Sequence, residues 1–162
     1  MNIFFLLATI LVFVTNISVI VASPSRPDID TVSISNLTPG VDGKLVSTRI
    51  TATMDTMLWS EDGTGITKFK GSYLGFSGEY RVAYDKGMIS QVSFVAPTHN
   101  PEEAIKFYDQ MSEQLIAYFG PADISSSSSV HELRWEGMKQ SYSIKAVDAT
   151  NYVTVALSRF ER

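Results

Sequence analysis

The side chains that could carry acid–base or metal chemistry are few in this chain of 162 residues, which has two histidines and no cysteine. His99 stands shortly before Glu102 and Glu103. An imidazole and two carboxylates are donors that bind divalent metal ions, so these three residues are candidate metal ligands. The same acids also suit a solvated helix start, because they complement the positive end of a helix dipole. We expect no cofactor, since neither histidine has the H-x-x-x-H or H-E-x-x-H spacing of a zinc site.

The second histidine, His131, follows a run of serines from Ser125 to Ser129 and precedes Glu132. A serine, a histidine and an acid are the components of a catalytic triad. A serine run is typical of a flexible loop, however, whereas catalysis requires groups held in fixed positions. Ser77 raises a similar question, but the stretch from Gly75 to Glu79 lacks the second glycine of a nucleophile elbow and leads into a predicted strand. We therefore assign no catalytic residue.

The overall composition excludes several classes of function. Without cysteine the chain cannot use a thiolate nucleophile, a cysteine zinc site or a disulfide. Its 13 basic and 17 acidic residues give a formal net charge of −4, and the basic residues do not cluster along the sequence. This argues against a nucleic-acid partner, whose phosphates require a basic surface.

The N-terminal segment carries no charged side chain from Met1 to Ser23 and is mostly apolar from Ile3 to Ala22. Such a segment is typical of a secretory signal peptide, and the small residues at its end favour cleavage after Ala22, which makes residues 1–22 the leader. The alternative is an uncleaved membrane anchor, because about twenty residues nearly span a bilayer core. In both cases we expect an exported protein, secreted or periplasmic, that contacts a membrane only through this segment if it is retained.

The rest of the chain predicts a linker or arm followed by one domain. Residues 23–43 mix proline, serine, aspartate and glycine with short apolar stretches, a composition typical of a flexible linker or an irregular arm. Residues 44–162 are numerous enough for a single α+β domain with its own core. From Lys44 onward apolar and polar residues alternate, which predicts a long half-buried strand.

Further strands are expected where apolar residues recur at every second position. Alternation up to Tyr84 and again from Met88 predicts a hairpin closed at Asp85-Lys86-Gly87, where glycine can adopt positive φ. Three more strand candidates follow the serine run, at residues 133–135, 142–146 and 153–157.

The strongest local pattern predicts one amphipathic helix after Asn100. Asn100 can serve as the N-cap, and Pro101 suits the first helical position. Gly120 and Pro121 predict its end. Between them, apolar residues recur at spacings of three and four, which indicates a helix with one face packed on a sheet. The residues of this stripe are Ala104, Ile105, Tyr108, Met111, Leu115, Tyr118 and Phe119.

These elements predict an α+β fold: a curved antiparallel sheet of about six to seven strands with one amphipathic helix packed on one face, in the order β-β-β-β-α-β-β-β. Short connections between strands require antiparallel neighbours. The face opposite the helix, or a concave groove, is the expected binding surface. Trp59 and Trp135 are the expected anchors if they lie on it, since tryptophan is enriched at binding hot spots.

No motif in the sequence identifies a family, and three hypotheses for function remain. The preferred one is an exported, non-catalytic binding or interaction module of the cell envelope, whose partner would be a protein or an envelope component. One alternative is a small exported hydrolase or metal-dependent enzyme that uses His99 or His131 with neighbouring acids. Another is a carrier of a small apolar ligand between helix and sheet, which would require a cavity of several hundred cubic ångströms.

Overall fold

The computed structural model describes residues 26–46, 54–59 and 63–160. The expected signal peptide or anchor at residues 1–22 lies outside these ranges, and so does much of the strand expected to begin at Lys44. Its expected first residues, Lys44 and Leu45, lie in a short 3₁₀-helix instead. Within the described ranges, no helix is long and apolar enough to cross a membrane.

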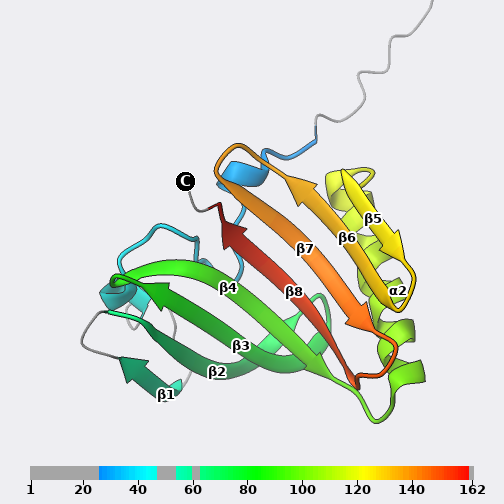
Figure 1. The fold of residues 1–162 in the computed structure, drawn as a ribbon, viewed down its shortest axis with the longest axis horizontal. Coiled ribbons are helices and arrows are strands. Elements are labelled where there is room, and N and C mark those ends of the chain that lie inside the picture. The colour runs from blue at the N-terminus through cyan, green and yellow to red at the C-terminus, as the bar shows by residue number, and fades with distance from the viewer. Residues whose placement is uncertain (1–25, 47–53, 60–62, 161–162) are drawn as a thin grey trace, which may run out of the picture.

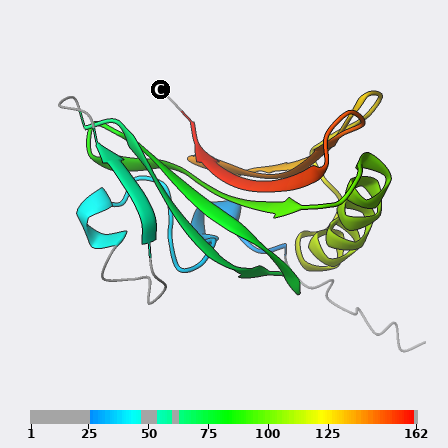
Figure 2. The same cartoon turned by 90° about the horizontal axis from the view of Figure 1, so that it is seen from below.

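The described residues form one open antiparallel sheet with an α-helix on one side (Figure 1). The strands are β1 (Met54–Trp59), β2 (Gly65–Tyr73), β3 (Phe76–Asp85), β4 (Met88–Pro97), β5 (Ile124–Ser127), β6 (Val130–Glu136), β7 (Gln140–Val147) and β8 (Tyr152–Arg159). Their order across the sheet is β1-β2-β3-β4-β8-β7-β6-β5. The chain therefore builds two four-stranded meanders, which join where β4 pairs with β8. Figure 2 shows that the sheet is bent and twisted rather than flat.

An antiparallel sheet with one helix is confirmed, but the predicted order β-β-β-β-α-β-β-β lacks one strand. The sheet has eight strands, and the additional one is β5, which covers part of the serine run expected to be a flexible loop. It pairs with β6 at the edge of the sheet, and all four of its residues are exposed. Because β5 is held by backbone hydrogen bonds and buries no side chain, it has no alternating apolar pattern.

Two tight turns connect β2 to β3 and β3 to β4. Leu74 and Gly75 have φ values of 52° and 86°, and Lys86 and Gly87 have values of 48° and 77°. Two consecutive residues at positive φ are typical of type I′ turns, whose twist matches that of the flanking strands. The hairpin predicted at residues 85–87 is thus present. Ser77 lies within β3 and pairs with β2, far from any strand-to-helix turn.

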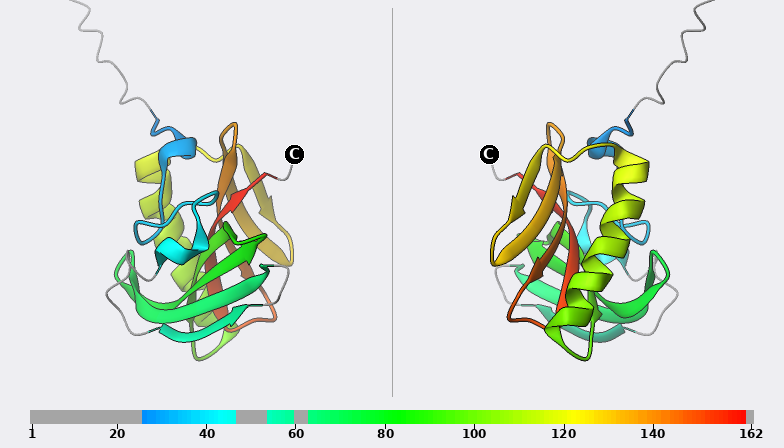
Figure 3. Two further views of the ribbon diagram at one scale, coloured as in Figure 1. Left: turned by 90° about the vertical axis from the view of Figure 1, so that its left-hand side faces the viewer. Right: turned by 90° about the vertical axis from the view of Figure 1, so that its right-hand side faces the viewer.

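The helix α2 (Pro101–Phe119) has the predicted start and end. The Glu103 N–H donates a hydrogen bond to the Asn100 side chain at 2.8 Å, which satisfies one of the free N–H groups at the helix start. Tyr118, expected in the apolar stripe, is 63% exposed and lies outside the core. The helix packs against β7 and β8 (Figure 3). Its buried residues are Ala104, Tyr108, Met111, Ser112, Leu115 and Phe119.

Residues 26–46 form an arm that packs into the core. The arm contains two short 3₁₀-helices, η1 (Ile29–Thr31) and η2 (Gly43–Leu45). Its buried apolar residues are Ile29, Ile34, Leu37 and Val46, which belong to the same core as the buried face of α2. Of the two alternatives, a flexible linker or an arm, these contacts favour the arm. The folded unit begins before Lys44.

The arm and α2 cover the same face of the sheet. On β7, Gln140 donates a side-chain hydrogen bond to the Ile29 carbonyl at 2.5 Å. Tyr142, two residues further on, packs against Phe119 of α2. Residues two apart on a strand point to the same side, so both covering elements lie on one face. The opposite face carries mainly polar or small side chains, including Arg81, Gln91, Ser93, Ser143, Lys145 and Thr154.

Candidate functional site

The candidate metal ligands lie at the start of α2. The His99 side chain is 92% exposed, and its Nδ1 lies 2.8 Å from Glu103 Oε2. The same oxygen accepts a hydrogen bond from the His99 backbone N–H at 2.6 Å, which is the main reason that the pKa of Glu103 lies below its usual value. Among the residues that the structure describes, no three His, Asp or Glu side chains converge to hold a metal ion. Glu102 is therefore not brought into a site with His99 and Glu103.

The second histidine has a carboxylate partner that the sequence did not indicate. His131 Nε2 lies 2.8 Å from Asp148 Oδ1. Glu132 points to the opposite face of the sheet and accepts a hydrogen bond from Arg134 at 2.5 Å. Ser127 is the residue opposite His131 across the β5–β6 pair, but in the described part of the chain no hydrogen bond joins this histidine to a serine. The structure thus pairs a histidine with an acid and does not assemble a triad.

Of the two predicted tryptophan anchors, the structure describes the side chain of Trp135 alone, and this side chain is buried. Trp135 has no exposed surface, and its ring packs against Phe119 and Tyr142. Its indole N–H donates a hydrogen bond to the Gly120 carbonyl at 2.9 Å. Trp135 is on the covered face because it shares the parity of the core residues of β6, so the prediction for this residue is corrected to a core role. The side chain of Trp59 lies outside the described residues.

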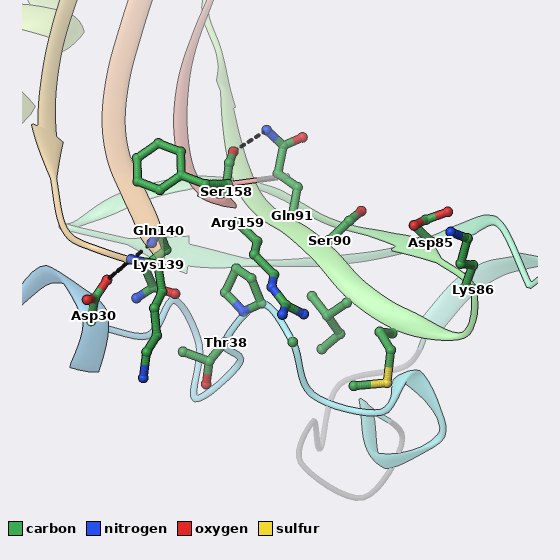
Figure 4. A pocket seen from close by; sticks show the side chains of 15 residues that line it. Asp30, Thr38, Asp85, Lys86, Ser90, Gln91, Lys139, Gln140, Ser158 and Arg159 are labelled. Atoms are coloured by element: carbon green, nitrogen blue, oxygen red, sulfur yellow. Dashed lines mark hydrogen bonds between the residues drawn. The ribbon is translucent and has the colours of Figure 1, made fainter. Parts of the chain in front are cut away.

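A wide opening lies at the end of the sheet where β4 begins and β8 ends, and we call it the β4–β8 groove (Figure 4). Its volume is about 1000 Å³. Five segments line it: the arm at residues 30 and 38–40, the end of β3 with its turn at 85–86, the start of β4 at 88–91, the β6–β7 turn with the start of β7 at 139–140, and the end of β8 with the next residue at 158–160.

The β4–β8 groove exists because its two strands diverge at this end. Their pairing runs only as far as Gln91 and Ser158. Beyond this point β8 remains hydrogen-bonded to β7. The start of β4 pairs with the arm instead, where the Ile89 N–H donates to the Val41 carbonyl at 2.8 Å. The arm therefore becomes one wall of the opening.

Asp30 of η1 fixes the β6–β7 turn at the edge of the groove. Its carboxylate accepts hydrogen bonds from the backbone N–H groups of Met138, Lys139 and Gln140 at 2.9, 2.8 and 3.1 Å. These bonds, that of Lys139 first, hold the pKa of Asp30 below its usual value. A Cβ at position 137 would lie 2.4 Å from Asp30 Oδ1, which explains why Gly137 occupies the turn. The carboxylate is thus engaged by the protein itself.

The charged side chains of the groove are mostly cationic: Lys86, Lys139 and Arg159, with Asp30 and Asp85 as the acids. Figure 4 shows Lys139 and Arg159 extending to the same side of the sheet, toward the arm at Thr38. Asp85 and Lys86 lie together at the other end of the groove. The geometry therefore offers two cations, Lys139 of the β6–β7 turn and Arg159 of β8, to a ligand that enters near Thr38.

A second hollow lies between η1, the β2–β3 turn and the C-terminal half of α2, and we call it the helix–arm hollow. Its volume is about 420 Å³. Most of its walls are apolar or aromatic, and they include Val32, Tyr73, Leu74, Leu115, Tyr118 and Phe119. The Tyr73 hydroxyl shares a short hydrogen bond with the hydroxyl of Tyr142, and burial raises the pKa of both tyrosines. A small apolar ligand would meet mostly apolar walls here.

The sequence predicted a concave groove as one possible binding surface but not the residues that form it. Their positions are set by the pairing of distant segments, and the only local signal was the turn that contains Lys86. Arg159 and Lys139 fall in no motif, because a cation at a strand end or in a turn is common on any protein surface. No protein-family model, curated protein or solved structure matches this chain, so the site has to be interpreted from its own geometry.

Proposed function

We propose that this protein is a non-catalytic binding module that takes up a ligand in the β4–β8 groove. The observation that carries the proposal is the groove itself, an opening of about 1000 Å³ whose walls come from five segments. This volume lies at the upper end of the range of ligand sites in proteins. The Asp30 hydrogen bonds hold one wall in place before a ligand arrives. Preformed walls favour binding because fewer groups lose freedom on association.

A hydrolase or metal-dependent enzyme that uses His99 or His131 has less support. Each histidine has one carboxylate partner, Glu103 or Asp148. Neither histidine lines the β4–β8 groove or the helix–arm hollow. A substrate in either opening would therefore be out of reach of the imidazoles, and a binding role requires fewer assumptions.

The proposal includes export to the cell envelope or beyond, and this part rests on the sequence of residues 1–22 alone. The ligand or partner is then an envelope component or a protein. Mass spectrometry of the protein purified from its native compartment tests the location. A mature N-terminus at Ser23 supports cleavage, and an intact leader supports the anchor.

A second candidate function, transport of a small apolar molecule, is favoured by the helix–arm hollow. Its volume of about 420 Å³ falls within the range of small-ligand sites. Leu74, Tyr118 and Phe119 give it apolar and aromatic walls. In this case the ligand would contact α2 and the arm rather than the ends of β4 and β8.

A thermal-shift screen against a library of small molecules and peptides tests the proposed function. We compare the wild type with Thr38→Trp, which fills the β4–β8 groove, and with Thr154→Trp, which places the same bulk on the open face of the sheet. A ligand at about one hundred times its Kd stabilises the folded state by about 2.7 kcal/mol, which raises Tm by several degrees. We expect at least one compound to stabilise the wild type and Thr154→Trp but not Thr38→Trp.

The same screen distinguishes the alternatives. Compounds that stabilise all three proteins equally would place the ligand outside the groove and favour the helix–arm hollow. Recovery of the compounds unchanged, measured by mass spectrometry after incubation, supports a non-catalytic role. Conversion of a stabilising compound into a product would contradict it.

A further inference from the structure

The β4–β8 groove concentrates positive charge in a chain that is acidic overall. Three cations and two carboxylates line the groove, whereas the whole chain has a formal net charge of −4. One of these carboxylates, Asp30, already accepts three backbone hydrogen bonds. The five charged side chains of the groove therefore carry a formal net charge of +1, in contrast to the −4 of the whole chain.

Arg159 is the cation best placed to meet a ligand. It is the last residue of β8, and a Cβ at position 40 would lie 3.4 Å from its Nη1, so the guanidinium lies over the glycine of the arm. Within the described ranges Arg159 forms no ion pair. Lys139 has a weak partner, since its charge contributes to the lowered pKa of Asp30. Both cations extend toward Thr38, whose hydroxyl can add a further hydrogen bond (Figure 4).

Apolar side chains also line the groove. Met88 and Phe160 line the same groove and are 38% and 36% exposed. Pro39 adds a third apolar wall on the arm side. A ligand that satisfied the cations alone would leave these side chains in contact with water, whereas a ligand with an apolar part would cover them.

We propose that the β4–β8 groove binds an organic anion, with its carboxylate or phosphate group held by Arg159 and Lys139 and its apolar part against Pro39 and Met88. A guanidinium donates two parallel hydrogen bonds to either anionic group, and such charge-assisted bonds are stronger than neutral ones. The inference rests on the proposed function and adds the chemical class of the ligand.

Two fluorescent dyes with the same ring system test this assignment. 1-Anilinonaphthalene-8-sulfonate carries a negative charge, and N-phenyl-1-naphthylamine is its neutral counterpart. We titrate both into the wild type, Arg159→Gln, Lys139→Gln and Lys145→Gln, the last of which removes a cation from the opposite face of the sheet. The Kd of the anionic dye should rise about tenfold or more in Arg159→Gln and by a smaller factor in Lys139→Gln. It should stay within about twofold in Lys145→Gln, and binding of the neutral dye should not change.

Displacement of the anionic dye identifies the anionic group. Hexyl phosphate and hexanoate share one apolar chain and differ in the head group, and hexyltrimethylammonium carries the opposite charge. Displacement by either anion and not by the cation supports the proposal. The anion that displaces the dye at the lower concentration shows whether the groove prefers phosphate or carboxylate. Displacement by the cation as well would overturn it. Circular dichroism of each variant confirms that the fold is retained, and Arg159→Lys, which keeps the charge, should restore part of the affinity.

The result can be separated from the test of the proposed function. If Arg159→Gln binds the anionic dye and a groove ligand as tightly as the wild type, the anion assignment fails. If Thr38→Trp still abolishes binding of that groove ligand, the groove has a binding function, but its ligand is not held as an anion by Arg159. If no ligand at all depends on residue 38, the proposed binding function of the β4–β8 groove fails.

Discussion

Glu103 and Asp30 use their carboxylates to bind backbone N–H groups. Glu103 accepts a hydrogen bond from the His99 N–H at 2.6 Å, and Asp30 accepts three from the β6–β7 turn. In both cases N–H dipoles stabilise the negative charge, so the pKa of each carboxyl is lowered. Glu103, which the sequence offered as a metal ligand, thus stabilises a helix start, and Asp30 stabilises a turn.

Replacement of His99 tests whether its imidazole has any role beyond the helix start. In His99→Ala the backbone N–H that binds Glu103 is retained and an exposed ring is lost. We expect the free energy of unfolding, measured with urea, to change by less than about 0.5 kcal/mol. Asn100→Ala, which removes the side-chain acceptor for the Glu103 N–H, should cost about 1 kcal/mol. A larger loss of unfolding free energy in His99→Ala than in Asn100→Ala would indicate that His99 is buried or binds a metal ion.

The Asp30 carboxyl should make stability depend on acid pH. In the folded state its pKa lies below the ordinary value of 3.8, which applies to the unfolded chain. The ionised carboxylate therefore stabilises the folded state above the unfolded pKa, and this stabilisation is lost as the pH falls through the folded pKa. Asp30→Asn should therefore unfold at lower urea than the wild type at pH 7, and the gap should narrow as the pH falls below 3.8. Asp109→Asn, an exposed carboxyl on α2, is the control and should follow the wild type. A gap that stayed constant with pH would show that the three hydrogen bonds do not depend on the charge.

At the scale of elements, the sequence predicted those that carry a periodic apolar pattern. The helix α2 was predicted with its N-cap and its end because capping residues and a stripe at spacings of three and four occur together. The strand β5 has three serines and no alternation, so only its pairing with β6 reveals it. The arm has isolated buried residues such as Ile34 and Leu37 without a period, which is why its composition resembles a linker.

The sequence predicted less of the candidate site than of the fold. An anchor role for Trp135 depends on which face of β6 it occupies, and only the register with β7 decides this. The groove depends on the divergence of β4 and β8, which no local pattern encodes. Side chains from five segments meet in the groove because the topology brings these segments together. A pattern in the sequence describes one segment at a time and does not show which distant segments are neighbours.

The packing of α2 is tested by two neighbouring residues on it. Leu115 is 2% exposed and Ile116 is 41% exposed, although both are large apolar side chains. Leu115→Ala should lower the free energy of unfolding by about 2 to 5 kcal/mol, because it leaves a cavity in the core. Ile116→Ala should cost less than about 1 kcal/mol, and equal effects in urea unfolding would contradict the packing of α2 described above.

At the scale of the whole molecule, the arm and α2 share the task of covering one face of the sheet. The arm contributes Ile29, Ile34, Leu37 and Val46 to the core. It also reaches the second meander, where Arg26 bonds Asp123 at 2.7 Å and lowers the pKa of that carboxyl to about 2. The two meanders are therefore joined by the arm as well as by the β4–β8 pair.

Removal of the arm should destabilise the entire fold. A chain that begins at residue 44 lacks three buried apolar residues, each of which contributes about 2 to 5 kcal/mol. Domains of this size have total stabilities of about 5 to 15 kcal/mol, so we expect this chain to be largely unfolded by circular dichroism. A chain that begins at residue 26 keeps the arm and should unfold cooperatively. Equal urea midpoints for the two chains would mean that the arm is a dispensable addition.

The position of β8 in the sheet has a consequence for the order in which the protein is made. β8 is the last strand in the sequence, yet it lies in the middle of the sheet between β4 and β7. The backbone N–H groups that donate hydrogen bonds to Asp30 likewise lie 108 to 110 residues later in the chain. As the chain emerges from the ribosome, the first meander can form its hairpins, but the core face stays exposed until β8 has been synthesised. We therefore expect the nascent chain to bind holding chaperones until β8 is available to complete the sheet.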